Sequence, residues 1–200
     1  MRIAFFDVET RKHALDLRPD DEQAGWDELR NGNGGASAIC IHDSKLNWLY
    51  LYDDTRRSLE TAIRHLESVD VVVGYCSDRF DLPCIEGISG RKLRLHHHID
   101  IFAEISRACA TLNIRTSIGD LKLDTICRKN IGRGKIEHGS HAKALAAEGR
   151  WAELFNYCSD DVHLTYDLFR YIIKHDGVHI NGHGWVPLTF PDYLKEWVKE

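Results

Sequence analysis

The sequence of 200 residues lacks an apolar run long enough to cross a bilayer. Its apolar stretches, such as Val71 to Val73 with their neighbours, fall far short of the about 20 residues that a membrane-spanning helix needs. No internal repeat or low-complexity segment appears. Met1 leads directly into a strand-like stretch, without a charged and then apolar signal region. We therefore expect a soluble, intracellular protein of the cytoplasm with no membrane partner.

The six cysteines form no CxxC pair and are scattered along the chain, mostly in apolar surroundings. This pattern excludes a recognisable zinc site or disulfide framework, and we expect reduced core residues. An excess of positive charge is also missing, since the formal net charge is -5. The charge argues against a surface coated for nonspecific nucleic-acid binding. It does not exclude an enzyme that acts on nucleic acid, because carboxylates filled by divalent metals become locally cationic.

The hydrophobic content of 43% suits one globular domain with a substantial core. We expect the domain to span residues 1–176, and residues 177–200 to be a C-terminal extension that packs on it or projects toward a protein partner. The pattern predicts a mixed α/β fold. Strands are expected at residues 2–10, 36–42, 46–52, 71–75 and 97–102. Helices are expected at 57–68, 117–132 and 150–174. Two further helices are expected, one with Asp81 in its first turn and one that follows the strand 97–102 and runs through Cys109. Residues 11–35 read as a long polar connection with one short helical turn near Trp26 and Leu29.

Two carboxylates close the first strand, in the stretch RIAFFDVET. The strand period of two places Asp7 and Glu9 on one face. Paired carboxylates repel each other and are costly to bury, so a cation between them commonly relieves them. Hard oxygen ligands select magnesium, manganese or calcium. Taken alone, the pair is better read as the start of a solvated turn, and the rest of the chain changes this interpretation.

A third carboxylate lies on the last strong helix. Asp161 falls on an apolar-biased stripe, and Tyr157 lies four residues before it on the same face. A carboxylate on an inward face needs a partner or a metal. Asp161 could instead cap or pair with an arginine, and Asp160 could be the buried residue, since a shift of one position turns the helix by about 100°.

Three stretches form a recognisable set: FFDVET, VVVGYCSDRFDLP and YCSDDVHLTYDLF. They resemble the three motifs of the DEDD superfamily of 3′ to 5′ exonucleases. Because a tyrosine lies four residues before the last aspartate, the third motif is similar to that of the DEDDy branch. This branch includes the exonuclease domains of family B DNA polymerases. The resemblance spans residues 1 to about 175. LKLDTICRKNIGRGK also looks like the segment between the family's second and third motifs.

This resemblance implies an RNase H-like fold with a mixed central sheet flanked by helices. It implies that two divalent metal ions, Mg²⁺ or Mn²⁺, are held by four carboxylates: Asp7, Glu9, Asp81 and Asp161. Tyr157 would orient the attacking water or help to deprotonate it. One departure is Cys76, because the family usually has asparagine there. A thiol does not reproduce the paired donor and acceptor groups of an amide, so we expect altered substrate positioning or activity.

Substrate-binding residues are less evident in the sequence. Four aromatic residues lie near the motifs, and each is read as core first and as a base-stacking platform second: Phe6, Trp26, Phe80 and Phe102. The basic stretch from Arg128 to Lys135 could contact backbone phosphates or could be a solvated helix end.

The predicted function is 3′ to 5′ exonuclease activity on single-stranded DNA or RNA, with the strand's 3′ end as partner. The alternatives are a noncatalytic nucleic-acid-binding or scaffolding protein that retains the fold, and a structure-selective endonuclease.

Overall fold

The computed structural model describes residues 1–135 and 140–199. The strands are β1 (Ile3–Thr10), β2 (Ala36–Asp43), β3 (Trp48–Tyr52), β4 (Val71–Gly74), β5 (His98–Asp100), β6 (Gly177–Ile180) and β7 (Gly184–Pro187). The helices are α1 (Ala14–Leu17), α2 (Glu22–Arg30), α3 (Arg56–Glu67), α4 (Asp81–Ser89), α5 (Ile101–Thr111), α6 (Leu123–Ile131), α7 (Ser140–Ala147), α8 (Trp151–His175) and α9 (Asp192–Lys199). Across these residues, no helix is long and apolar enough to cross a membrane.

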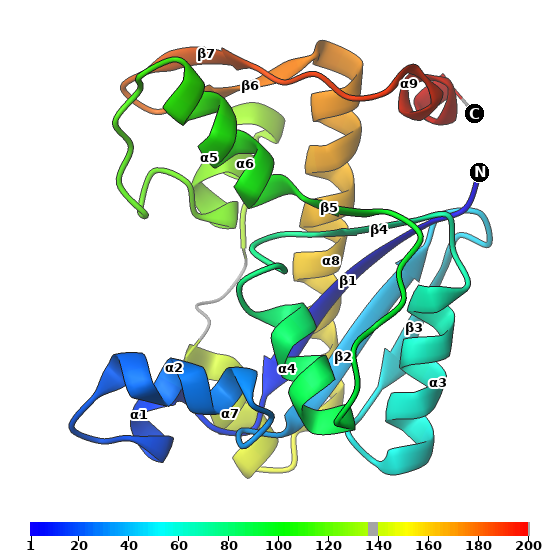
Figure 1. Cartoon of the computed structure of the whole chain (residues 1–200), viewed down its shortest axis with the longest axis vertical. Helices are drawn as coiled ribbons and strands as arrows, with labels where there is room; N and C mark the ends of the chain where they lie inside the picture. Colours follow the sequence, from blue (N-terminus) through cyan, green and yellow to red (C-terminus); the bar gives the residue numbers. More distant parts are fainter. Residues whose placement is uncertain (136–139, 200) are drawn as a thin grey trace.

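Five strands form a mixed sheet in the order β3-β2-β1-β4-β5, with β1 at its centre (Figure 1). β1 pairs antiparallel with β2 and parallel with β4, and β4 pairs parallel with β5. Helices cover both faces, as is typical of a sheet whose strands are joined by crossover connections. The predicted α/β, RNase H-like fold class is confirmed.

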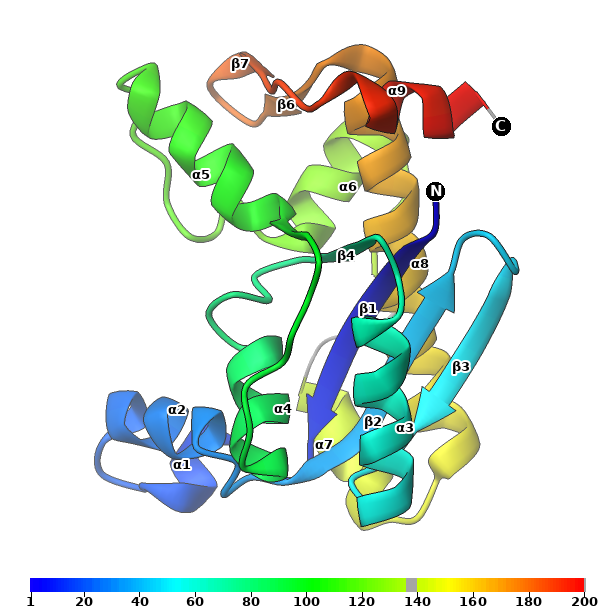
Figure 2. The same ribbon diagram turned by 45° about the vertical axis from the view of Figure 1, so that its right-hand side comes forward.

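The two faces of β1 belong to two different cores. Ala4, Phe6 and Val8 pack with α3 and the neighbouring part of α4, whereas Ile3 and Phe5 pack with α8. Figure 2 shows α3 and α8 on opposite sides of the sheet. Because side chains alternate along a strand, the odd-numbered positions that follow Phe5 project toward α8. This alternation aims the last side chains of β1 at the long helix.

The segment from residue 11 to residue 35 is more structured than predicted. Instead of one short turn it holds α1 and α2. The side chain of Asp21 caps α2 by accepting a hydrogen bond from the N–H of Ala24, and the ring of Trp26 packs edge-on against Phe80. Packing against α4 therefore stabilises a polar segment whose sequence periodicity is weak.

The predicted helix over 117–132 is also wrong in its first third, since α6 begins only at Leu123. The carboxylate of Asp120 accepts hydrogen bonds from the N–H and the hydroxyl of Ser117. Such side-chain bonds to nearby backbone favour a turn over a helix.

The C-terminal segment forms the β6–β7 hairpin and α9. Leu194 of α9 is fully buried, and Trp197 packs against Phe169 of α8. A protein partner for this segment stays a prediction.

A buried ionic network lies at the hairpin end of β2. The carboxylate of Asp43 is fully buried and accepts hydrogen bonds from Arg2 Nε at 2.6 Å and His65 Nε2 at 3.1 Å. Its other oxygen accepts the N–H groups of Lys45 and Leu46. Burial alone would raise the pKa of Asp43, but these hydrogen bonds outweigh it and lower the pKa.

Asp43→Asn is expected to lower the free energy of unfolding by about 2 kcal/mol. An amide cannot accept with both arms, so at least one buried donor loses its partner. Urea denaturation at pH 7 measures the loss. Glu104→Gln alters an exposed ion pair with Arg107 and should change stability by less than about 0.5 kcal/mol. A loss in Asp43→Asn no larger than in this control would contradict the assignment.

Candidate metal centre

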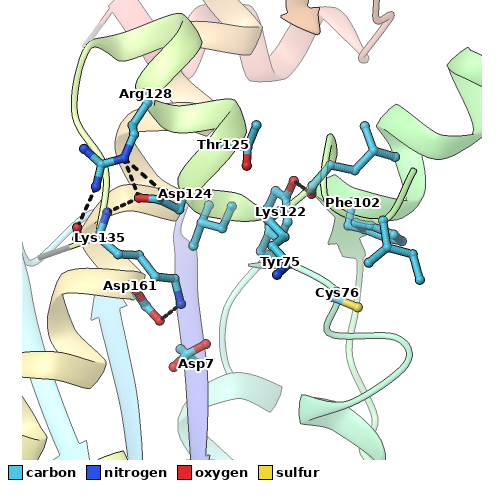
Figure 3. A pocket seen from close by; sticks show the side chains of 13 residues that line it. Asp7, Tyr75, Cys76, Phe102, Lys122, Asp124, Thr125, Arg128, Lys135 and Asp161 are labelled. Atoms are coloured by element: carbon cyan, nitrogen blue, oxygen red, sulfur yellow. Dashed lines mark hydrogen bonds and ion pairs between the residues drawn. The ribbon is translucent and has the colours of Figure 1, made fainter. Parts of the chain in front are cut away.

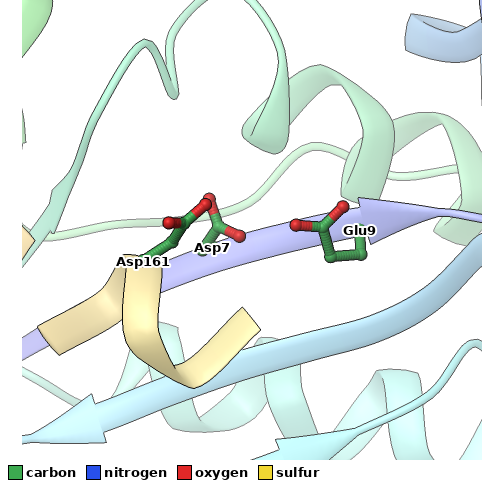
Figure 4. Close-up of side chains that lie close together, drawn as sticks. All are labelled: Asp7, Glu9 and Asp161. Atoms are coloured by element: carbon green, nitrogen blue, oxygen red, sulfur yellow. The ribbon is translucent and has the colours of Figure 1, made fainter. Parts of the chain in front are cut away.

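Three carboxylates converge where β1 passes α8 (Figure 4). Oxygen atoms of Asp7, Glu9 and Asp161 all lie within 4.8 Å of one another. Asp7 and Glu9 come from the end of β1, and Asp161 comes from the inward face of α8, where it is 4% exposed. Asp160 points to Arg133 instead, with a nitrogen–oxygen distance of 3.9 Å. The prediction that Asp161 is the inward aspartate is confirmed.

Asp81 lies beside this group, but its carboxylate is not within 4.8 Å of all three other carboxylates. It is the first residue of α4, is 3% exposed, and its carboxylate accepts a hydrogen bond from the N–H of Val8 on β1. The position at a helix N-terminus favours a negative charge. Two strand residues, one helix N-terminus and one helix face thus bring four carboxylates from distant parts of the chain together.

Burial and mutual repulsion act against ionisation of these groups. Burial, followed by repulsion from Asp161, raises the pKa of Asp7 to about 7. Burial and the neighbouring Asp7 likewise raise the pKa of Glu9 and of Asp81 well above their usual range. Burial also raises the pKa of Asp161, although an adjacent ammonium opposes this. Carboxylates in this state are stabilised by cations.

Lys135 brings one positive charge to the cluster, and the sequence analysis did not assign it there. Its ammonium pairs with Asp161, and the carboxylates outweigh the effect of burial and raise the pKa of Lys135. Its backbone is held by α6: the N–H of Lys135 donates to Asp124 Oδ1, and Arg128 donates to the carbonyl of Lys135. A Cβ on Gly134 would lie 2.4 Å from that Asp124 oxygen, so this approach requires glycine.

Tyr157 and Cys158 flank the cluster from the preceding turn of α8. The ring of Tyr157 lies 5.8 Å from the ammonium of Lys135, and burial together with the charge of Asp161 raises the pKa of its hydroxyl. The thiol of Cys158 contacts Asp7 Oδ2 at 3.6 Å. All six cysteines are free thiols, as predicted.

A pocket of about 600 Å³ opens beside Asp7 and Asp161 (Figure 3). One wall is the β4–α4 loop with Tyr75 and Cys76, and the opposite wall is the start of α6 with the turn before it. The hydroxyl of Tyr75 donates to the carbonyl of Leu121 and joins the two walls. The pocket therefore has carboxylates at one end, and apolar and basic side chains along its length.

The four aromatic residues near the motifs divide between core and pocket. Phe6 is 1% exposed in the core, and Trp26 packs with Phe80. Phe102 lines the pocket and lies under the guanidinium of Arg79, 5.4 Å from the ring centroid. Phe102 is thus the member of this set that lines the pocket (Figure 3).

Asp7→Asn is expected to stabilise the protein in EDTA. The pKa of Asp7 is about 7 in the folded state against an ordinary 3.8. Its ionisation therefore has no effect on folding below pH 3.8, opposes folding increasingly between pH 3.8 and 7, and opposes it fully above pH 7. The variant should gain roughly 1–3 kcal/mol at pH 8, and the gain should vanish by pH 3.5. Urea denaturation across this range measures it.

Asp20→Asn, which alters an exposed carboxylate, controls for the change in net charge. Saturating Mg²⁺ should reverse the order at pH 8, because a bound cation stabilises only the protein that retains the ligand. A variant that is less stable than wild type in EDTA at pH 8 would contradict the assignment.

Comparison with known proteins yields a fold relationship. No family model and no curated protein sequence matches the chain. Among solved structures, the family B DNA polymerase of the hyperthermophilic archaeon Pyrobaculum calidifontis is similar, with a TM-score of 0.57 and 17% sequence identity over 86% of this chain. The chain spans 25% of the length of that polymerase. At this identity the similarity shows a shared fold, which is the RNase H-like α/β architecture of this chain.

Proposed function

We propose that the protein is a metal-dependent 3′ to 5′ exonuclease that hydrolyses phosphodiester bonds of single-stranded DNA or RNA. The observation that carries the proposal is the convergence of Asp7, Glu9 and Asp161, with Asp81 beside them, next to a pocket that Asp7 and Asp161 line. The resemblance of the three sequence motifs to the DEDDy exonucleases supports it. The fold shared with a family B DNA polymerase agrees with an enzyme of nucleic acids.

The residues present fit divalent metal ions. The donors are hard carboxylate oxygens, which suit Mg²⁺ and Mn²⁺. Four carboxylates with raised pKa values meet the single charge of Lys135, so the cluster carries unbalanced negative charge when ionised. Two bound ions would supply an activated water and stabilise the charge on the leaving 3′ oxygen.

The side chains have separate roles in this proposal. The metal ligands are the four carboxylates: Asp7, Glu9, Asp81 and Asp161. The raised pKa of Tyr157 keeps its hydroxyl protonated at neutral pH, so the hydroxyl is not available as a base. We therefore assign Tyr157 the orientation of the attacking water by hydrogen bonding. Lys135 places a cation beside the position of the substrate phosphate, where negative charge develops during hydrolysis.

The pocket suits an unpaired strand. Phe102 and Ile118 offer apolar surface to a base, and Lys122 and Arg128 offer positive charge to the backbone. Its volume of about 600 Å³ gives room for the end of such a strand. A few contacts decide whether a protein recognises the 2′ hydroxyl, and we propose both DNA and RNA as substrates.

Degradation of 5′-labelled single-stranded DNA and RNA tests the function. Wild type with Mg²⁺ or Mn²⁺ should produce a ladder that shortens from the 3′ end, and EDTA or Asp7→Ala should abolish it. Internal fragments would identify an endonuclease. A folded wild-type protein that binds the strands without cutting either one would establish the noncatalytic binding protein.

Tyr157→Phe should lower kcat by about 100-fold while Mn²⁺ binding, measured by calorimetry, is unchanged. The reason is that the substitution removes one hydroxyl and leaves the carboxylates in place. Tyr193→Phe, at an exposed tyrosine of α9, is the matched control and should retain full activity. Equal activity of the two variants would remove Tyr157 from the mechanism.

A further inference from the structure

The loop between β4 and α4 delivers Asp81 to the acidic cluster. It spans residues 75–80, and its backbone is unusual because Cys76 has φ 63°, in the left-handed region that non-glycine residues rarely adopt. A residue in this region persists only where its surroundings hold it. Residues 76–78 of this loop are held by side chains of the edge strand β5.

Asp100 makes the main contacts. This aspartate ends β5 and is 3% exposed. Its Oδ1 accepts the N–H of Cys76 at 2.9 Å, and its Oδ2 accepts the N–H of Asp78 at 2.9 Å. Oδ1 also accepts the N–H of Ala103 and so caps α5. Both carboxylate oxygens are thus committed to backbone N–H groups, two of which lie in the loop.

His98 makes a second set of contacts from the same strand. Its Nε2 lies 2.9 Å from the hydroxyl of Ser77, and its Nδ1 lies 3.1 Å from Asp78 Oδ1. Ser77 is fully buried against Gly74, where an added Cβ would lie 2.4 Å from the hydroxyl oxygen. Three successive loop residues therefore each bond to a side chain of β5.

These bonds act on Asp81 through a short connection. The carbonyl of Ser77 accepts the N–H of Leu82, so the loop residue held by His98 also holds the first turn of α4. From the other side, the carboxylate of Asp81 accepts the N–H of Val8 on β1. The direction of the carboxylate thus depends on β1 on one side and on β5 on the other.

The geometry points to Asp100 and His98 as positioning residues that set Asp81 for cation binding. This inference rests on the proposed function of the cluster and assigns the two residues no contact with substrate. Residues that orient metal ligands typically change metal affinity or activity by 10- to 100-fold when they are substituted. A purely structural role would lower stability without this effect.

Asp43 provides a matched control. Like Asp100, it is a buried aspartate whose two oxygens accept several donors, including two backbone N–H groups, but it lies at the hairpin end of β2. Asp100→Asn and Asp43→Asn therefore remove comparable bonds at two different places. The comparison separates loss of stability from loss of positioning.

The experiment measures Mn²⁺ binding to the full chain by electron paramagnetic resonance, together with kcat and KM for strand degradation. Asp100→Asn should weaken Mn²⁺ binding and lower kcat by about 10-fold each, with partial recovery of kcat at high Mn²⁺. Asp43→Asn should bind Mn²⁺ as wild type does. His98→Ala retains the cap of α5 and should change Mn²⁺ affinity in the same direction as Asp100→Asn, so the test stands if the latter fails to fold.

Wild-type Mn²⁺ affinity in Asp100→Asn and His98→Ala would overturn the inference, as would equal weakening in Asp43→Asn. A wild-type protein that binds no Mn²⁺ would overturn it together with the proposed function. If wild type binds Mn²⁺ but cuts no strand, the exonuclease proposal fails, and the Mn²⁺ affinities of the variants still decide the role of Asp100.

Discussion

Like-charge crowding at the end of β1 is the constraint on which the rest of the site depends. Asp7, Glu9 and Asp161 lie within 4.8 Å of one another in a partly buried position, with Asp81 adjacent. In a medium of lower polarity than water, such groups resist ionisation, and their pKa values are raised accordingly. The fold tolerates this arrangement because two apolar cores, one on each face of the sheet, support it.

Most of the surrounding structure serves to hold these groups in place. α6 holds the backbone of Lys135 so that its ammonium reaches Asp161, and β5 holds the loop that leads to Asp81. The thiol of Cys158 packs against Asp7 from α8. Asp7, Asp81 and Asp161 thus each have a neighbour that restricts their direction, as preorganised cation sites require. The crowded carboxylates lower the free energy of unfolding, and the buried side chains of the two apolar cores raise it.

The sequence was most informative where chemistry and periodicity coincide. Asp7 and Glu9 follow an apolar strand, and Asp161 falls on an apolar helix stripe, so each is conspicuous as a charge in a core position. Lys135 and Asp100 carried no such signal. A lysine in a basic stretch and an aspartate before a helix are both common at surfaces, and their roles depend on contacts with residues 26 and 22 to 24 positions away.

Secondary structure was predicted least well where tertiary contacts decide it. α1 and α2 have weak periodicity and are stabilised by packing of Trp26 on Phe80, whereas the turn at Ser117 is set by a side-chain hydrogen bond in a segment with helical spacing. Neither effect is visible in composition or in the spacing of apolar residues. The fold class was predictable because it depends on many residues, so these local errors did not change it.

The distance along the chain between the two sides of the cluster has a consequence for biosynthesis. Cys158 and Asp7 are in contact although they are 151 positions apart, and Asp161 lies beyond Cys158. Domains form as units during translation, and contacts of long sequence separation form late. A nascent chain therefore has no complete acidic cluster until α8 has left the ribosome and docked on β1, so Asp7 and Glu9 wait without Asp161 while the residues between them are made.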